Sequence, residues 1–129
     1  MTYKVNHIHL KSKNPEVTAE WFVNAFNVKI ISDTHRPIGD RFIETEAEGG
    51  MKINISSERT NEILGPADSD AHYGLEHFGF DSEDINKDIE RLVSMGAELK
   101  EGPREVEGGP IIAFISAPGD IRIELIQSR

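Results

Sequence analysis

The sequence HIHLKSKNPE, residues 7–16, returns 70 residues later in altered form as HFGFDSEDIN, residues 77–86. Each stretch begins with a histidine in a short strand-like segment, and each has a helix-capping residue seven positions later, Asn14 or Asp84. The match is one of chemistry and position, with little identity between the two strings. A repeat at a fixed offset indicates that one folding unit occurs twice along the chain.

The residues around the first stretch predict a β-α-β-β-β unit. Alternation over residues 3–11 is typical of a strand with one polar face. Pro15 and Glu16 suit the first turn of a helix, and apolar residues continue at helical spacing to about Asn27. Further strands are expected at residues 28–32, 41–46 and 51–57.

The residues around the second stretch predict the same order of elements. A strand at 75–81 and a helix at 82–95 precede strands at 97–100, 111–116 and 121–127. We therefore expect an α+β fold of two βαβββ modules in tandem, which form a curved mixed β-sheet cup with helices on the outer face. The expected domain is single and spans 1–129, with module one at about 1–57, a polar connector at 58–72 and module two at about 73–129.

Composition excludes several classes of function. A net charge of -9 argues against a nucleic-acid partner, which needs a basic surface to meet phosphates. The absence of cysteine rules out disulfides, thiolate metal ligands and cysteine nucleophiles. No apolar run has the length of a membrane span, and the N-terminus lacks the features of a signal peptide. We expect no membrane partner and a cytoplasmic location.

The repeat also predicts where a site lies. The 70-residue offset aligns His7 with His77 and Asn54 with Glu124. Because side chains alternate along a strand, these residues lie on the polar faces of their strands. If the helices pack against the apolar faces, the polar faces would line a cleft. Two imidazoles and one carboxylate form a face that suits a divalent cation such as Fe, Mn, Co, Ni or Zn, with positions left open. Asn54 would add a weak carbonyl ligand or bond a bound water.

Two cations follow the same offset. Lys52 and Arg122 align with each other, and each lies two residues before Asn54 or Glu124 on the same strand face. In an acidic protein, two cations directed into a cleft favour a small substrate with an anionic group. The alternative is that both side chains lie at the rim, paired with surface carboxylates.

These motifs resemble the vicinal oxygen chelate superfamily, which includes glyoxalase I, methylmalonyl-CoA epimerase, fosfomycin thiol transferases, extradiol dioxygenases and bleomycin-binding proteins. The resemblance rests on the doubled element order, the opening HIHL, HFGFDSEDI at 77–85 and GDIRIELI at 119–126. It implies that His7, His77 and Glu124 are the metal ligands. It also implies a homodimer. In some members of the superfamily the cleft is built from two chains.

Two departures from the family pattern bear on the reaction. Glyoxalase I and the epimerase have Glu or Gln where this chain has the shorter Asn54, so the resemblance implies three firm ligands here. Extradiol enzymes have a tyrosine at the position of Phe114, which has no proton to donate. Bleomycin-binding relatives have generally lost the ligands that this chain keeps.

The predicted site favours a lyase or isomerase of the glyoxalase or epimerase type, which stabilises an enolate of a small oxygenated substrate. Such a reaction needs a general base, for which His9 is the first candidate, with His35 or Glu76 as others. We therefore assign catalytic roles to His9 and Glu124; His9 could instead fix His7 or contact substrate. Two alternatives stay open: a non-haem Fe(II) dioxygenase, and a metal-poor protein that sequesters a ligand as bleomycin-resistance proteins do.

Overall fold

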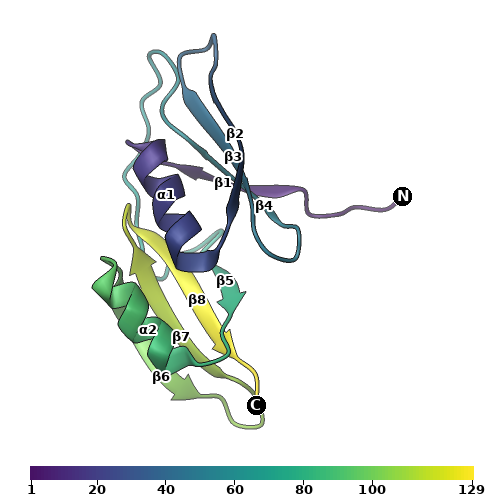
Figure 1. Ribbon diagram of the computed structural model, residues 1–129, viewed down its shortest axis with the longest axis vertical. Coiled ribbons are helices and arrows are strands. Elements are labelled where there is room, and N and C mark those ends of the chain that lie inside the picture. The colour runs from purple at the N-terminus through teal and green to yellow at the C-terminus, as the bar shows by residue number, and fades with distance from the viewer. The chain divides into compact units, whose positions relative to one another are not determined.

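The computed structural model describes residues 1–129, which form two compact units, Met1–Gly65 and Pro66–Arg129 (Figure 1). The boundary lies inside the predicted polar connector. Each unit holds one helix and one four-stranded mixed sheet, so the predicted α+β class with two tandem modules is confirmed. That the modules form one domain stays a prediction.

The first unit contains five elements, and its sheet has the strand order β1-β4-β3-β2. β1 runs parallel to β4, and the other neighbouring strands are antiparallel. The residues of the unit before β1 form an extended N-terminal segment (Figure 1). The elements are β1 (His7–Lys11), α1 (Pro15–Phe26), β2 (Lys29–His35), β3 (Arg41–Glu46) and β4 (Lys52–Ser56).

The second unit repeats this topology with the order β5-β8-β7-β6. β5 is parallel to β8, and the remaining pairs are antiparallel. Between β4 and β5 the connector has no helix or strand. The elements are β5 (Phe78–Asp81), α2 (Ile85–Ser94), β6 (Glu98–Glu105), β7 (Ile111–Ala117) and β8 (Ile121–Gln127).

The strand registers follow the 70-residue offset. His9 pairs with Asn54 in the first unit, and Gly79 pairs with Glu124 in the second. The helix caps follow it too, because Asn14 Oδ1 accepts from the backbone N–H of Val17, and Asp84 Oδ1 accepts from that of Lys87. The repeat that the sequence suggested therefore holds at the level of single hydrogen bonds.

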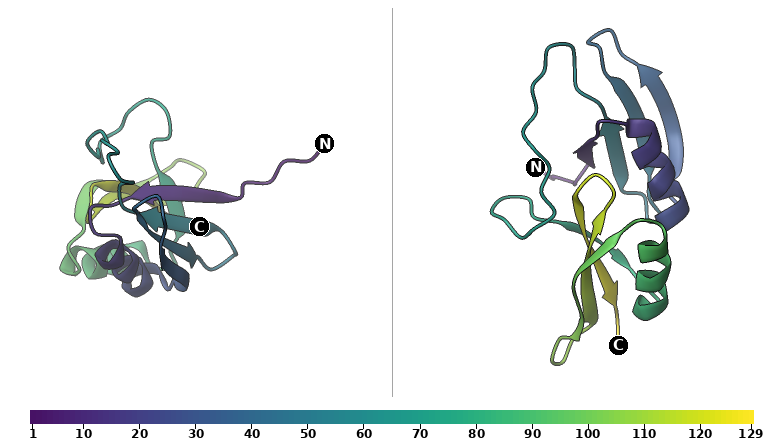
Figure 2. Two further views of the ribbon diagram at one scale, coloured as in Figure 1. Left: turned by 90° about the horizontal axis from the view of Figure 1, so that it is seen from above. Right: turned by 90° about the vertical axis from the view of Figure 1, so that its left-hand side faces the viewer.

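In each unit the helix lies on one face of the sheet (Figure 2), and the side chains on that face are buried. In the first unit Phe22 of α1 and the β4 residues Ile53 and Ile55 are at most 1% exposed. Leu92 of α2 and Ile123 of β8 are fully buried in the second. Burial of such a side chain contributes about 1.5–3 kcal/mol. The opposite face of each sheet, here called the helix-free face, is left for polar side chains.

Some predicted strand ends were wrong. β1 begins at His7 and not at residue 3, because the register of β4 opposite it starts at Lys52 and earlier residues have no partner. β5 likewise starts at Phe78 and not at 75. β6 extends to Glu105, beyond the predicted end at 100, because β7 supplies partners along its length.

Neither helix has the length and apolar composition needed to cross a membrane.

Candidate functional site

The predicted metal ligands divide between the two units. His7 lies at the start of β1 in the first unit, whereas His77 and Glu124 belong to the second. The structure gathers no three His, Asp or Glu side chains into a group that could hold a metal ion, so the complete ligand set stays a prediction. Each unit carries one part of the predicted set, with distinct local geometry.

In the second unit, His77 and Glu124 face each other. His77 directly precedes β5, and Glu124 lies in the neighbouring strand β8, where it pairs with Gly79. The distance from His77 Nε2 to Glu124 Oε1 is 3.3 Å. Both side chains are partly accessible, at 30% and 17% exposure. The sheet therefore presents an imidazole nitrogen and a carboxylate oxygen together on its helix-free face.

The His77 ring is held on two further sides. Its Nδ1 lies 3.2 Å from Glu76 Oε1, and the ring makes a T-shaped contact with Phe114, with ring centroids 4.9 Å apart. A carboxylate on Nδ1 favours the tautomer that carries its proton there, which leaves the Nε2 lone pair directed at Glu124.

Arg122 is engaged by neighbouring groups of its own unit, and its predicted substrate-binding role stays a prediction. Its Nε donates to Glu76 Oε1 at 3.0 Å, its Nη1 donates to the carbonyl of Ser69 at 3.1 Å, and its guanidinium stacks on Phe114. The side chain is only 8% exposed. Hydrogen bonds from His77 and Arg122 lower the pKa of the Glu76 carboxyl, with His77 the larger cause. Glu76 thus stays ionised between them.

The first unit repeats this arrangement at His7. Its Nδ1 lies 2.8 Å from Asn6 Oδ1, and Asn6 is separated from Glu76 by the same 70 residues that separate His7 from His77. Sequence reasoning missed Asn6 and gave Glu76 only as a possible base. The signal was available, because an oxygen-bearing residue precedes both histidines.

The other predicted residues of the first unit lie on β4. Lys52 Nζ donates to Glu44 Oε1 at 2.8 Å, and this bond raises the pKa of the lysine. The lysine is therefore paired with a carboxylate, as the rim alternative expected. Asn54 lies between His9 and Glu44 in the register of the sheet, on the helix-free face.

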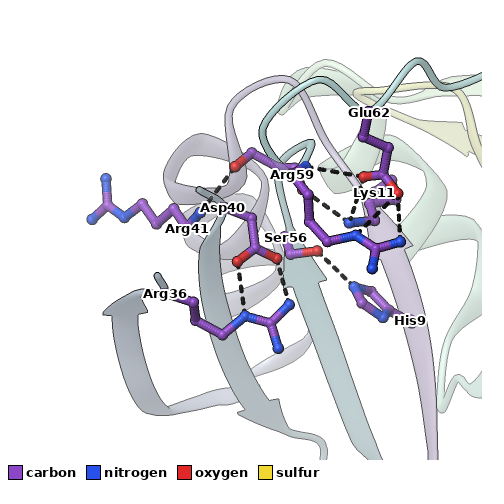
Figure 3. Close-up of polar contacts among 9 residues, drawn as sticks. His9, Lys11, Arg36, Asp40, Arg41, Ser56, Arg59 and Glu62 are labelled. Carbon is purple, nitrogen blue, oxygen red and sulfur yellow. Dashed lines mark hydrogen bonds and ion pairs between the residues drawn. The ribbon is translucent and has the colours of Figure 1, made fainter. Parts of the chain in front are cut away.

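His9, the candidate base, is fixed by a buried hydroxyl. Its Nε2 lies 2.7 Å from Ser56 Oγ (Figure 3). Its ring also makes a T-shaped contact with Phe42. Burial lowers the pKa of His9, and the positive charge of Lys11 lowers it further. A neutral imidazole near pH 7 is the form that a general base requires. His35, by contrast, belongs to the edge strand β2, opposite Arg41.

The donor set in the second unit fits a divalent cation. Bonds of about 2.1 Å to a cation place two adjacent donor atoms about 3.0–3.4 Å apart, for octahedral or tetrahedral geometry. The observed 3.3 Å between Nε2 and Oε1 falls in this range.

Similar proteins are lyases and metal-binding resistance proteins. A lactoylglutathione lyase of Arabidopsis thaliana is 24% identical over 128 residues, and a putative lactoylglutathione lyase of Brassica oleracea is 23% identical over 128 residues. Each match covers 94% of this chain and 43% of the relative, so the chain spans less than half the length of these proteins.

Solved structures share the fold at low identity. A glyoxalase family protein from Bacillus cereus superposes with a TM-score of 0.85 at 15% identity, covering 99% of this chain and 95% of that one. The fosfomycin resistance protein FosX of Listeria monocytogenes, in a complex with Mn(II) and 1S,2S-dihydroxypropylphosphonic acid, gives 0.72 at 22% identity, covering 98% and 90%.

The family model matches almost the whole chain, from residue 4 to residue 125. The match includes both repeats and therefore all the candidate ligands. The chain belongs to the Glyoxalase/Bleomycin resistance protein/Dioxygenase superfamily.

Proposed function

We propose that the protein is a divalent-metal-dependent lyase or isomerase of the glyoxalase or epimerase type, with His7, His77 and Glu124 as its metal ligands. The observation that carries this proposal is the pair of donor atoms 3.3 Å apart, His77 Nε2 and Glu124 Oε1. Their separation and chemistry match two adjacent ligands of one cation.

The two histidines are prepared in the same way. Asn6 engages Nδ1 of His7, and Glu76 engages Nδ1 of His77. A hydrogen bond on one ring nitrogen of a ligating histidine fixes the tautomer and makes the other nitrogen a better ligand. Since the internal repeat preserves this feature at both positions, it supports a shared role for the two imidazoles.

His7, His77 and Glu124 would hold a divalent cation, which would supply Lewis-acid polarisation of a substrate carbonyl and so make the neighbouring C–H bond more acidic. His9 is the proposed base. When its Nε2–H donates to Ser56 Oγ, the Nδ1 lone pair is free to accept the proton. The lowered pKa of His9 keeps this nitrogen unprotonated near neutral pH. A return of the proton from Nδ1 to carbon completes an isomerisation.

The relatives support this class of reaction over its alternatives. The curated relatives are lactoylglutathione lyases, and the FosX complex contains Mn(II). Phe114 pairs with Glu124 and packs on His77, at a position where ring-cleaving dioxygenases would need a proton-donating hydroxyl. The proposed substrate is a small oxygenated molecule, and the proposed assembly is a homodimer.

Elemental analysis after anaerobic purification tests the proposal. We expect wild type to take up about one equivalent of Mn, Fe, Co, Ni or Zn per predicted three-ligand site. His77→Ala and Glu124→Gln should lose it, whereas His72→Ala, which removes an exposed histidine of the connector, should not. Wild type with bound metal should also exchange a substrate C–H proton with deuterated solvent.

Other outcomes would replace the proposal. Equal metal uptake by His77→Ala and wild type would show that the ligand assignment is wrong. Iron together with oxygen consumption would indicate the dioxygenase, and a wild type that takes up no metal would leave the ligand-sequestering protein.

A further inference from the structure

Three cations of the first unit gather beside His9 (Figure 3). Lys11 follows His9 on the same face of β1, Arg36 lies in the turn after β2, and Arg59 lies in the connector after β4. We call these three residues the cation cluster. Lys11 and Arg59 both contact Glu62, and the Arg36 guanidinium and the His9 ring both pack against Phe42, so the three cations lie close to His9 and to one another.

Arg36 is held rigidly. Its Nε donates to Asp40 Oδ1 at 2.8 Å, its Nη2 donates to Oδ2, and its guanidinium carbon lies 4.3 Å above the Phe42 ring. Asp40 is fully buried, and the bond from Arg36 keeps its pKa below the usual range. Because carboxylate and ring fix two sides of the guanidinium, its remaining N–H edge is preorganised.

Glu62 holds the other two cations. Arg59 donates to Glu62 Oε2 from Nη2 at 2.8 Å, and Lys11 Nζ lies 3.4 Å from Oε1. Lys11 also donates to the carbonyl of Ser57 at 2.9 Å. The bonds from Arg59 lower the pKa of Glu62 to about 2, so this carboxylate stays charged in the neutral range.

The cluster keeps a positive excess and unused donors. Its three cations face two carboxylates, Asp40 and Glu62, in a chain whose net charge is -9. Nη1 of Arg36 and Nη1 of Arg59 donate to no protein acceptor. The His9 imidazole supplies a further polar edge beside them. Fixed guanidinium N–H groups with a net positive charge are suited to an oxyanion.

We propose that the cation cluster binds the oxyanion group of a small substrate, either a carboxylate or a phosphate or phosphonate. The inference deepens the proposed function, on which its placement rests. Lys11 lies four residues beyond His7 on the same face of one strand, a separation of roughly 13 Å. A small anionic molecule anchored at the cluster could thus extend along β1 past His9 towards His7.

Phosphate titration of the metal-free full-length chain, in the presence of a chelator, tests this inference. We expect saturable NMR shifts at Lys11, Arg36, Arg59 and the His9 imidazole. Parallel titrations with acetate and methylphosphonate identify the preferred oxyanion by the lower Kd.

Variants that remove one charge, compared with a matched control, distinguish specific phosphate binding at the cluster from general electrostatic attraction. Arg59→Gln should raise the phosphate Kd about tenfold, the loss of one charge-assisted contact. Arg41→Gln removes the same charge from the same unit, but Arg41 pairs with Asp33 and Glu16 elsewhere. Its Kd should stay within about twofold of wild type, because the Arg41 side chain points away from the cluster (Figure 3) and is already paired with two carboxylates.

Arg36→Gln with Asp40→Asn removes both partners of this ion pair together, so that the buried Asp40 carboxylate is not left unpaired. This double variant should also weaken phosphate binding while keeping the fold. Equal weakening by Arg41→Gln and Arg59→Gln, or no saturable shifts in wild type, would overturn the inference. Because the titration uses metal-free protein and the metal test uses His77 and Glu124, failure of either proposal can be recognised separately.

Discussion

Replacement of Glu76 by alanine should weaken metal binding without touching a proposed ligand. Glu76 Oε1 lies 3.2 Å from Nδ1 of His77 and accepts from Nε of Arg122 at 3.0 Å. Its removal frees the His77 ring to rotate and to change tautomer. The prediction therefore concerns a positioning residue whose effect on metal is indirect.

The expected magnitude follows from the exposure of the contact. Loss of such a partner typically lowers metal affinity about 10–100-fold, or about 1.4–2.8 kcal/mol. Glu76 is 33% exposed, so water can replace part of the lost bond, and we expect the lower end, about tenfold. Glu76→Gln keeps an oxygen acceptor and should lose about threefold, by the same reasoning.

Competition between the protein and a chromophoric chelator for Co(II) measures the change. Glu90→Gln is a matched control, because this exposed carboxylate lies on α2. Urea midpoints must be compared as well, since Arg122 is only 8% exposed and loses its carboxylate partner. Arg122 keeps the Ser69 carbonyl and the Phe114 ring, so the fold should survive.

A Glu76→Ala protein with native fold and wild-type Co(II) affinity would refute this reasoning. It would mean that the Nδ1 contact does not prepare His77 as a ligand. A loss of the same size in Glu90→Gln would point instead to a general effect of charge.

Three further predictions concern the first unit, the strand pair at Glu124 and the core. The pKa of His9 is lower in the folded chain than its ordinary value of 6.5, so as pH falls the imidazole is protonated first in the unfolded chain. The contribution of His9 to stability should therefore be complete above about pH 6.5 and should decrease as the pH falls below it. Urea midpoints from about pH 5 to 8 should show a shallower slope in His9→Gln; an unchanged slope contradicts the assignment. Gly79→Ala places a Cβ 3.2 Å from the Glu124 carbonyl oxygen, so it should displace this strand pair and weaken Co(II) binding; unchanged affinity would show that the pair can adjust. Ile123→Ala should cost about 2–5 kcal/mol in unfolding free energy, because the side chain is fully buried; a cost near zero would contradict the described core.

Contacts between neighbouring side chains were the hardest part of the site to predict. The offset pointed to His77 and Glu124, but periodicity does not tell how a side chain is engaged, and only the structure shows their facing atoms. The contacts of Arg122 with Glu76, Ser69 and Phe114 had no signal in the sequence, and its substrate-binding role stays a prediction. The cation cluster was missed because Arg36 and Arg59 come from a turn and a connector, where no periodic pattern places side chains.

By itself the sequence determined the order of elements, the duplication and the pairing of Asn54 and Glu124 as equivalent positions, because periodicity, caps and a fixed offset are properties of the chain. Strand register, by contrast, depends on hydrogen bonds between distant segments, and only the folded units fixed where β1, β5 and β6 begin and end. The 3.3 Å approach of His77 to Glu124 likewise required the tertiary structure. Its physical reason is that parallel pairing of β5 with β8 brings together residues that are 47 positions apart.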